Sequence, residues 1–124
     1  MNFYVGWALP EGERERLLKM FPPAHENVIA HHVTDVFGVD DSYPISDETS
    51  GVVVGVAQDE RIQALVFEIG GGTERADGRT YHSTWSIDRA AGAKPKMSND
   101  VIASHGWRMV PRVRVTLLPS RFPT

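Results

Sequence analysis

The sequence Thr-Tyr-His-Ser-Thr-Trp-Ser-Ile at residues 80–87 alternates between two kinds of side chain. Successive side chains of an extended strand point to opposite faces, so the stretch has one mainly apolar face and one polar face. The mainly apolar face holds Tyr81, Ser83, Trp85 and Ile87. The polar face holds Thr80, His82, Thr84 and Ser86. The alternation predicts a β-strand that rests on a core and presents hydroxyl and imidazole groups either to a cleft or to water.

The segments around this strand predict a domain built mainly of strands. Residues 51–57 and 62–69 are apolar runs joined by four polar residues, which is typical of a β-hairpin. Further strands are predicted at 3–9, at 28–37 and within 108–118. Residues 38–50 predict an acidic loop, and 70–79 predict a polar loop that opens with three glycines.

Two helices complete the expected order of elements. The first begins at Pro10, whose missing N–H costs nothing in a first turn, and ends before Pro22-Pro23. The second is short, is capped by Ser98 or Asn99, and runs to about His105, where Gly106 ends it. The sequence therefore predicts an α+β fold, a mostly antiparallel sheet with one N-terminal helix and one short late helix.

The composition is that of an ordinary globular protein. A chain of 124 residues with 41% hydrophobic and 23% charged residues predicts a single domain over residues 1–124 and excludes the disordered class. It has no cysteine, which excludes disulfides and cysteine-ligated zinc. No apolar run reaches the roughly 20 residues that span a bilayer, and residues 1–5 lack a basic leader. We expect a cytoplasmic protein without membrane contact.

Charge is unevenly distributed along the chain. The formal net charge is −3, yet residues 105–124 contain four arginines and no acidic residue. This local +4 leaves −3 − 4 = −7 on the rest of the chain. Such asymmetry is typical of a region that attracts an anionic ligand, and equally of a solvated strand face. The negative total disfavours a broad surface for coating nucleic acid.

Two strands carry the same pair of reactive side chains. His32 and Thr34 share a face of the strand predicted at 28–37, as His82 and Thr84 do in the strand at 80–87. Two such His–Thr dyads around one pocket suit cleavage of a phosphate ester. One neutral imidazole removes a proton from the attacking water, and a protonated one gives a proton to the departing oxygen. Threonine hydroxyls donate to phosphate oxygens on which charge develops.

The two His-x-Thr motifs, His32-Val33-Thr34 and His82-Ser83-Thr84, resemble the double motif of the 2H phosphoesterase superfamily. The opening stretch 3–10 is similar to the first strand and turn of its LigT-like branch. The stretch 81–86, followed by Gly92, Lys94-Pro95 and Ser98-Asn99, is similar to the second-motif region of RNA-repair-associated members. The resemblance covers residues 3–10, 28–38 and 62–102.

This resemblance implies a function as well as a fold. Members of the superfamily are 2′,3′-cyclic-nucleotide or RNA-end phosphodiesterases and 2′–5′ RNA ligases, with a bilobal α+β fold whose cleft lies between the two motifs. Acid–base catalysis by two histidines needs no metal, and we expect no cofactor. The resemblance thus implies a hydrolase whose substrate is a small nucleotide or RNA end, with His32, His82, Thr34 and Thr84 as catalytic residues. Asp35 stands where the family usually has an aliphatic residue, and Ser83 replaces a branched apolar one.

Other residues receive supporting assignments. Candidates for substrate binding are the basic residues expected at the cleft rim and a hydroxyl on the polar strand face: Lys94, Lys96, Arg108 and Ser86. His31 is expected to point away from His32, on the opposite face of a regular strand. No metal site is expected, because no His-Glu-x-x-His or similar ligand spacing occurs.

Two alternatives to catalysis remain open at this point. The same pocket suits a module that binds a nucleotide or RNA end without converting it. The polar strand faces also suit a structural or oligomerisation domain whose hydroxyl groups are merely solvated.

Overall fold

Strand β1 (Phe3–Ala8) lies at the centre of a small antiparallel sheet. In the computed structural model, which describes residues 2–124, β1 pairs with β3 (His32–Val39) on one side and with β8 (Leu118–Pro123) on the other. The aromatic and β-branched residues of β1 favour an extended chain. Val5 and Trp7 are buried, and they anchor this sheet to the core.

A larger sheet of five strands faces the small one. Its order is β2 (Asn27–Val28), β6 (His82–Ile87), β5 (Ile62–Glu68), β4 (Ser50–Gln58) and β7 (Arg108–Thr116), and every pair is antiparallel. The fold is therefore α+β and antiparallel, as the sequence predicted, but its strands form two sheets and not one. The expected hairpin is β4 and β5.

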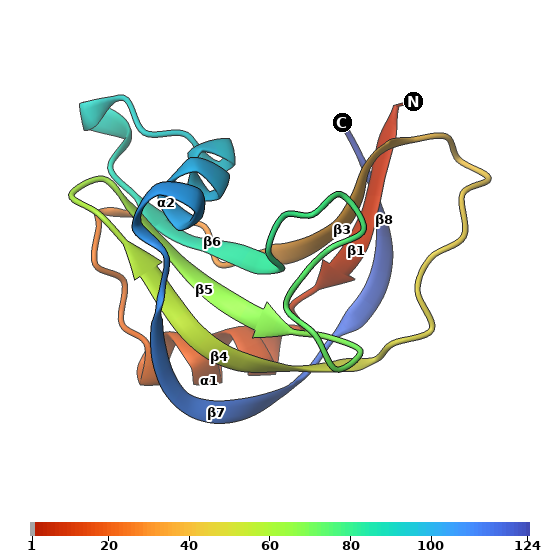
Figure 1. Cartoon of the computed structure of the whole chain (residues 1–124), viewed down its shortest axis with the longest axis horizontal. Coiled ribbons are helices and arrows are strands. Elements are labelled where there is room, and N and C mark those ends of the chain that lie inside the picture. Colours follow the sequence, from red (N-terminus) through yellow and green to blue (C-terminus); the bar gives the residue numbers. More distant parts are fainter. Residues whose placement is uncertain (1) are drawn as a thin grey trace.

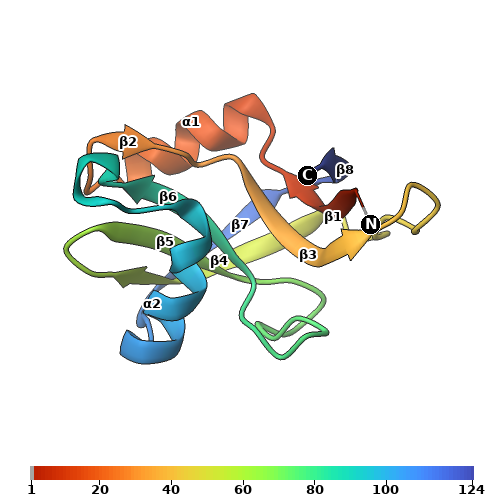
Figure 2. The ribbon, with the colours of Figure 1, turned by 90° about the horizontal axis from the view of Figure 1, so that it is seen from above.

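Two α-helices cover opposite faces of the large sheet, as Figure 2 shows. Helix α1 (Glu11–Met20) follows Pro10, and helix α2 (Ser98–His105) ends at Gly106, where φ is +68°. Both helices lie where the sequence predicted them, but Ser98 and Asn99 are within α2, and the capping residue is Met97, which forms no side-chain cap. Two short 3₁₀ helices, η1 (Arg89–Ala91) and η2 (Pro95–Met97), connect β6 to α2.

The core has two parts, one on each face of the large sheet. The first part lies between the two sheets and α1, and it includes Trp7, Leu17 and Trp85. Both indoles satisfy their N–H groups, since Trp85 Nε1 donates to the carbonyl of Phe21 at 2.7 Å and Trp7 Nε1 donates to that of Glu48 at 3.0 Å. The second part lies under α2 and includes Val101 and Ile102.

The C-terminal strands join the two sheets. β7 ends the large sheet, the buried Leu117 donates its N–H to the carbonyl of Thr49, and β8 then continues in the small sheet (Figure 1). The sequence predicted β7 but not β8. Pro119 and Pro123 argue against a strand, yet β8 lies at the edge of its sheet, where proline is tolerated.

The strand expected at 28–37 is instead two strands in different sheets. β2 ends at Val28, β3 begins at His32, and between them Ala30 has a positive φ of 44°. The Ala30 N–H donates to the carbonyl of Thr84 at 3.0 Å, which holds this break against β6. The prediction was wrong here because an apolar run does not show where a chain changes sheets.

No helix within residues 2–124 is long and apolar enough to cross a membrane.

Candidate functional site

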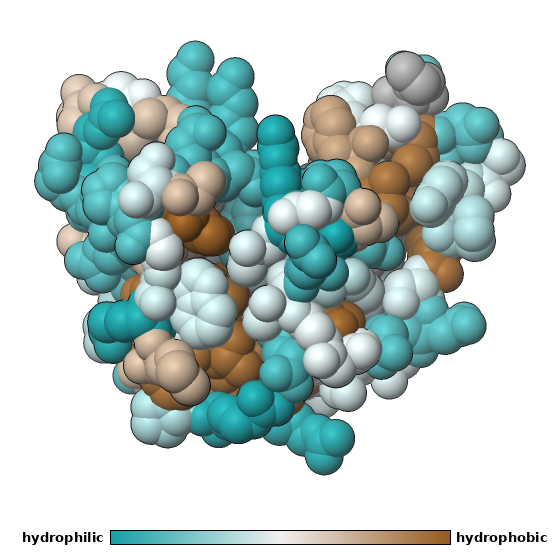
Figure 3. Space-filling model, in the orientation of Figure 1, coloured by the Kyte–Doolittle hydropathy of each residue, from teal (hydrophilic) through white to brown (hydrophobic). Residues whose placement is uncertain are grey.

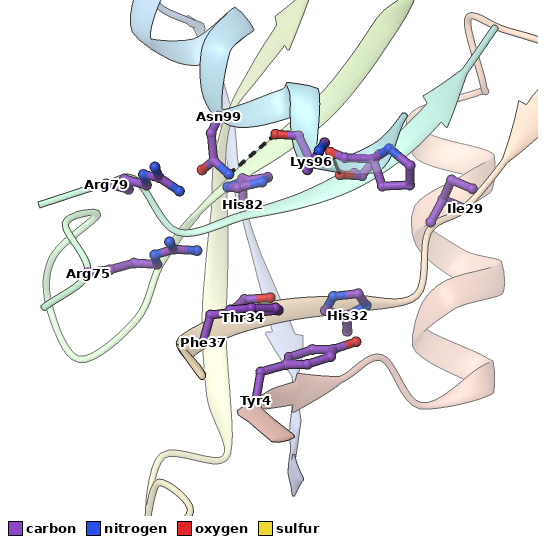
Figure 4. A pocket seen from close by; sticks show the side chains of 12 residues that line it. Tyr4, Ile29, His32, Thr34, Phe37, Arg75, Arg79, His82, Lys96 and Asn99 are labelled. Carbon is purple, nitrogen blue, oxygen red and sulfur yellow. Dashed lines mark hydrogen bonds between the residues drawn. The ribbon is translucent and has the colours of Figure 1, made fainter. Parts of the chain in front are cut away.

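A cavity of about 380 Å³ opens between the two sheets. Figure 3 shows the surface hollowed between the two lobes of the molecule. The cavity is lined by both His–Thr dyads, His32 with Thr34 and His82 with Thr84 (Figure 4). Residues from β1, the loop before β6, η2 and α2 complete the lining. The structure thus brings together, from two sheets, the four residues that the sequence suggested as catalytic.

The first dyad is placed by the pairing of β1 with β3. His32 lies opposite Ala8 and Thr34 lies opposite Gly6, while Val33 between them is fully buried in the core. A Cβ atom at position 6 would overlap the carbonyl oxygen of Val33. Glycine at this position therefore allows β3 to lie close enough to β1 for its two polar residues to face the cavity.

The second dyad is placed by β6. His82 and Thr84 line the cavity, whereas Ser83 and Trp85 are fully buried on the opposite side of the strand. The Thr84 hydroxyl donates to the carbonyl of Pro95 at 3.1 Å and lies 2.8 Å from the hydroxyl of Ser98. Thr84 therefore also ties β6 to η2 and to the start of α2.

Ser86 lies outside the cavity, although the sequence put it on the same face as His82. The pairing of β6 with β5 slips by one residue, so that Ser86 faces Gln63 while Thr84 faces Ala64. This bulge turns Ser86 away from the dyad. Its hydroxyl is buried, donates to Gln63 Oε1 at 2.6 Å and accepts the N–H of His25 at 3.1 Å.

His82 is held in one tautomer by its own strand. Its Nδ1 lies 2.9 Å from the carbonyl oxygen of Thr80. Because a carbonyl only accepts, Nδ1 carries the hydrogen, and in the neutral ring Nε2 keeps its lone pair. Burial lowers the pKa of His82, the hydrogen bond to Thr80 opposes that effect, and the positive charges of Arg75 and Arg79 lower the pKa further.

His32 has a different neighbour. Its Nδ1 lies 3.0 Å from Nδ1 of His31, and its ring packs against the rings of Tyr4 and Phe122, with centroids 5.3 and 5.2 Å away. Burial lowers the pKa of His32 to about 4, and the charges of protonated His31 and His82 act in the same direction. Without a bound ligand, His32 is therefore neutral at pH 7. His82 is close enough that its positive charge, when it is protonated, lowers the pKa of His32.

The adjacency of His31 and His32 contradicts the sequence expectation. His31 was expected on the opposite face of a regular strand. Strand β3 begins only at His32, and His31 lies between it and Ala30, whose φ is positive. His31 therefore does not follow the alternation of a strand, and the two rings meet at 77° with centroids 5.1 Å apart.

Basic residues form the side of the cavity next to His82. Arg75 and Arg79 come from the loop that follows β5, and Lys96 comes from η2 (Figure 4). Arg75 is buried and forms a salt bridge of 2.6 Å with Asp77, whose pKa this contact lowers to about 2. Asp77 also accepts the backbone N–H of Arg79 at 2.9 Å, so one carboxylate holds the Arg75 side chain and the backbone at Arg79.

Two other residues suggested for substrate binding lie elsewhere. Lys94 is exposed just before η2, outside the lining of this cavity. Arg108 lies on β7 and lines a separate open groove with Asp59 and His105. Of the three basic residues named from the sequence, Lys96 is the one at the cavity, because 3₁₀ helix η2 directs it there.

Several lining residues were not anticipated: Tyr4, Ile29, Phe37, Arg75, Arg79, Pro95 and Asn99. The dipeptide Asp77-Gly78, between Arg75 and Arg79, is a local signal for a turn. That this turn folds over the dyad follows only from tertiary packing.

The two residues that depart from the family pattern have structural settings of their own. Asp35 is partly buried, accepts a hydrogen bond from the Tyr81 hydroxyl at 3.5 Å, and has a pKa raised by burial. The Ser83 hydroxyl is buried without a hydrogen-bond partner among the described residues. Asp35 follows Thr34 directly in the sequence, and Ser83 lies between His82 and Thr84 with its side chain buried on the opposite side of β6.

No cluster of three or more His, Asp or Glu side chains in residues 2–124 is arranged to hold a metal ion. Comparisons of the chain with protein-family models, with curated proteins and with solved structures find no match.

Proposed function

We propose that this chain is a metal-independent phosphodiesterase that hydrolyses a 2′,3′-cyclic phosphate or a related RNA-end phosphodiester in the cytoplasm. One observation carries the proposal: a single cavity between two sheets is lined by His32 and Thr34 from one sheet and by His82 and Thr84 from the other. Two imidazoles on opposite walls are suited to remove and to supply a proton at one phosphorus centre. The resemblance of both motifs to 2H phosphoesterases agrees with this chemistry.

The hydrogen bonds suggest how the roles divide. His82 offers the lone pair of Nε2, because its Nδ1–H is engaged by Thr80, and it suits the general base that activates water. His32 on the other wall then supplies the proton to the departing oxygen. Thr34, Arg79 and Lys96 lie where they can stabilise the charge that builds on the phosphate oxygens.

The size and lining of the cavity support a small substrate. A volume of about 380 Å³ is near the lower end of the usual range for ligand sites, roughly 300–1,000 Å³. The exposed Phe37 ring stacks on the ring of Tyr4 along one wall, with centroids 5.6 Å apart. An apolar wall beside cationic groups suits a nucleotide, which has both an aromatic base and a phosphate.

The test is turnover of 2′,3′-cyclic nucleotides and of short RNAs with cyclic-phosphate ends, in the presence of excess chelator. The wild type is expected to open the ring, and His32→Ala and His82→Ala should each lower kcat about 100-fold or more. His105→Ala is the matched control, since His105 is exposed and lies in the other groove. Full activity in both cavity variants would overturn the assignment of the catalytic pair.

A second candidate is a module that binds a nucleotide or RNA end without converting it. The observation in its favour is that the Thr84 hydroxyl already donates to the Pro95 carbonyl and the Nδ1–H of His82 is engaged by the Thr80 carbonyl, so this dyad has no free donor while His82 is neutral. Calorimetry distinguishes the two. Binding of a cyclic nucleotide with no product after prolonged incubation would favour the module.

A further inference from the structure

The two cavity histidines are held by partners of different chemistry. His82 Nδ1 meets a carbonyl oxygen, which only accepts a hydrogen bond. His32 Nδ1 meets Nδ1 of His31, which accepts when it has no hydrogen and donates when it has one. The tautomer of His82 is therefore fixed by the backbone, whereas that of His32 depends on the protonation of a neighbouring side chain.

Two contacts hold His31 in this position. Its backbone carbonyl accepts the N–H of Leu9 at 3.0 Å, and its ring meets the edge of Phe122 at a centroid distance of 5.8 Å. The residue itself is exposed, while His32 beside it is largely buried. One imidazole of the pair thus reaches solvent and the other lines the cavity (Figure 4), with a nitrogen–nitrogen contact of 3.0 Å between them.

We propose that His31 is a proton relay for His32: it takes a proton from solvent and passes it to Nδ1 of His32 as His32 releases its Nε2 proton into the cavity. This inference rests on the proposed function for its catalytic consequence, but the sharing of a proton between the two rings does not. His31 touches neither substrate nor the reacting atoms and is a positioning residue.

The proton transfer balances as follows. Protonated His31 donates its Nδ1–H to His32, so neutral His32 carries its hydrogen on Nε2. When the ester bond breaks, the Nε2–H bond of His32 breaks and an O–H bond forms on the departing oxygen. At the same time the Nδ1–H bond of His31 breaks and an Nδ1–H bond forms on His32. The positive charge of His31 and the negative charge of the leaving oxygen cancel, and solvent restores both rings.

The two rings differ in burial, and this difference explains why His32 would need a relay. Burial disfavours a charge on His32, whose pKa falls to about 4, so this ring holds little of its own acidic form near neutrality. Water solvates a charge on the exposed His31 at smaller cost. The other titratable or charged groups lining this cavity are Tyr4 from β1, His82 from β6, Arg75 and Arg79 from the loop and Lys96 from η2. Of these groups, protonated His82 opposes a charge on His32, and Arg75 and Arg79 oppose a charge on His82.

The first test needs no substrate. Nitrogen-15 NMR of histidine side chains distinguishes Nδ1–H from Nε2–H tautomers, and spectra of the wild type are recorded between about pH 5 and 7, where histidine ionises. We expect neutral His82 to carry its hydrogen on Nδ1, and neutral His32 to carry its hydrogen on Nε2 once His31 is protonated. A neutral His32 that keeps its hydrogen on Nδ1 across this range would overturn the inference.

Two substitutions separate positioning from proton delivery. His31→Phe keeps a ring against Phe122 but offers no hydrogen bond, so the Nε2–H preference of His32 and roughly tenfold or more of kcat should be lost, with little change in KM. His31→Gln offers an amide donor that does not ionise. It should restore the His32 tautomer but not the rise in kcat that protonation of His31 gives the wild type as pH falls.

The outcomes also separate this inference from the proposed function. If His31→Gln keeps the wild-type pH profile, the relay is wrong whatever the activity of the enzyme. If the wild type turns over no phosphodiester yet shows the expected tautomers, the proposed function fails and the shared proton stands. His105→Gln, outside the cavity, controls for the loss of one histidine.

Discussion

Replacing His32 by asparagine should make the stability of the protein less sensitive to acid. In the folded protein burial lowers the pKa of His32 to about 4 from its usual 6.5. As pH falls below 6.5 the unfolded chain therefore binds a proton at this residue that the folded chain does not bind until about pH 4. Above pH 6.5 this contribution to the free energy of unfolding is fully present. The wild type loses it as the pH falls from 6.5 to about 4.

The magnitude follows from the two pKa values. The interval from 6.5 to about 4, at about 1.36 kcal/mol per unit, corresponds to about 3 kcal/mol. His32 is largely buried, so solvent screens little of this effect. An asparagine does not ionise, and the variant should lack this contribution even if its stability at neutral pH differs for reasons of packing.

The assay is urea unfolding at a series of pH values from about 7.5 to 4 in buffers without phosphate. The free energy of unfolding is extrapolated to water for the wild type and for His32→Asn. The difference between the two proteins should shift by about 3 kcal/mol in favour of the variant as pH falls to about 4. His105→Asn, at an exposed position, should follow the wild type.

A difference that stays constant within about 0.5 kcal/mol over this range would refute the reasoning. It would mean that His32 ionises equally well in the folded and unfolded chain, so that burial does not control its pKa. The same result would also remove the reason for His31 to act as a proton relay, because His32 could then hold its own proton near neutrality.

Four further substitutions test which residues stabilise the fold and which act in the cavity. Thr84→Val removes the hydroxyl that donates to a backbone carbonyl and should cost about 1–3 kcal/mol in urea unfolding, whereas Thr34→Val should lower kcat with little loss of stability. Gly6→Ala places a Cβ against the carbonyl oxygen of Val33, so we expect a fall in stability of roughly 1–3 kcal/mol or more and a loss of activity; unchanged values would show that β3 shifts freely. Leu17→Ala empties a fully buried position, and calorimetry should show a loss of about 2–5 kcal/mol with activity retained in the folded fraction.

Local pattern determined much of this fold. The alternation at 80–87 places Trp85 in the core and His82 with Thr84 on the cavity side, because strand residues alternate whatever lies around them. The β4–β5 hairpin and both helix ends follow from residues adjacent in the chain. The two His–Thr pairs are likewise visible in the sequence, since each pair needs only a spacing of two along one strand.

Tertiary structure decided which of these groups meet and how they are oriented. The bulge that turns Ser86 toward Gln63 arises from a one-residue slip in strand pairing, and pairing register depends on the partner strand. The break at Ala30 depends on a hydrogen bond to Thr84, which is 54 positions away in the sequence. At that break the chain passes from β2 in the large sheet to β3 in the small sheet, and His31 comes into contact with His32. The alternation in the sequence therefore found the two catalytic candidates, but only contacts between distant segments placed them in one cavity and gave each a different neighbour.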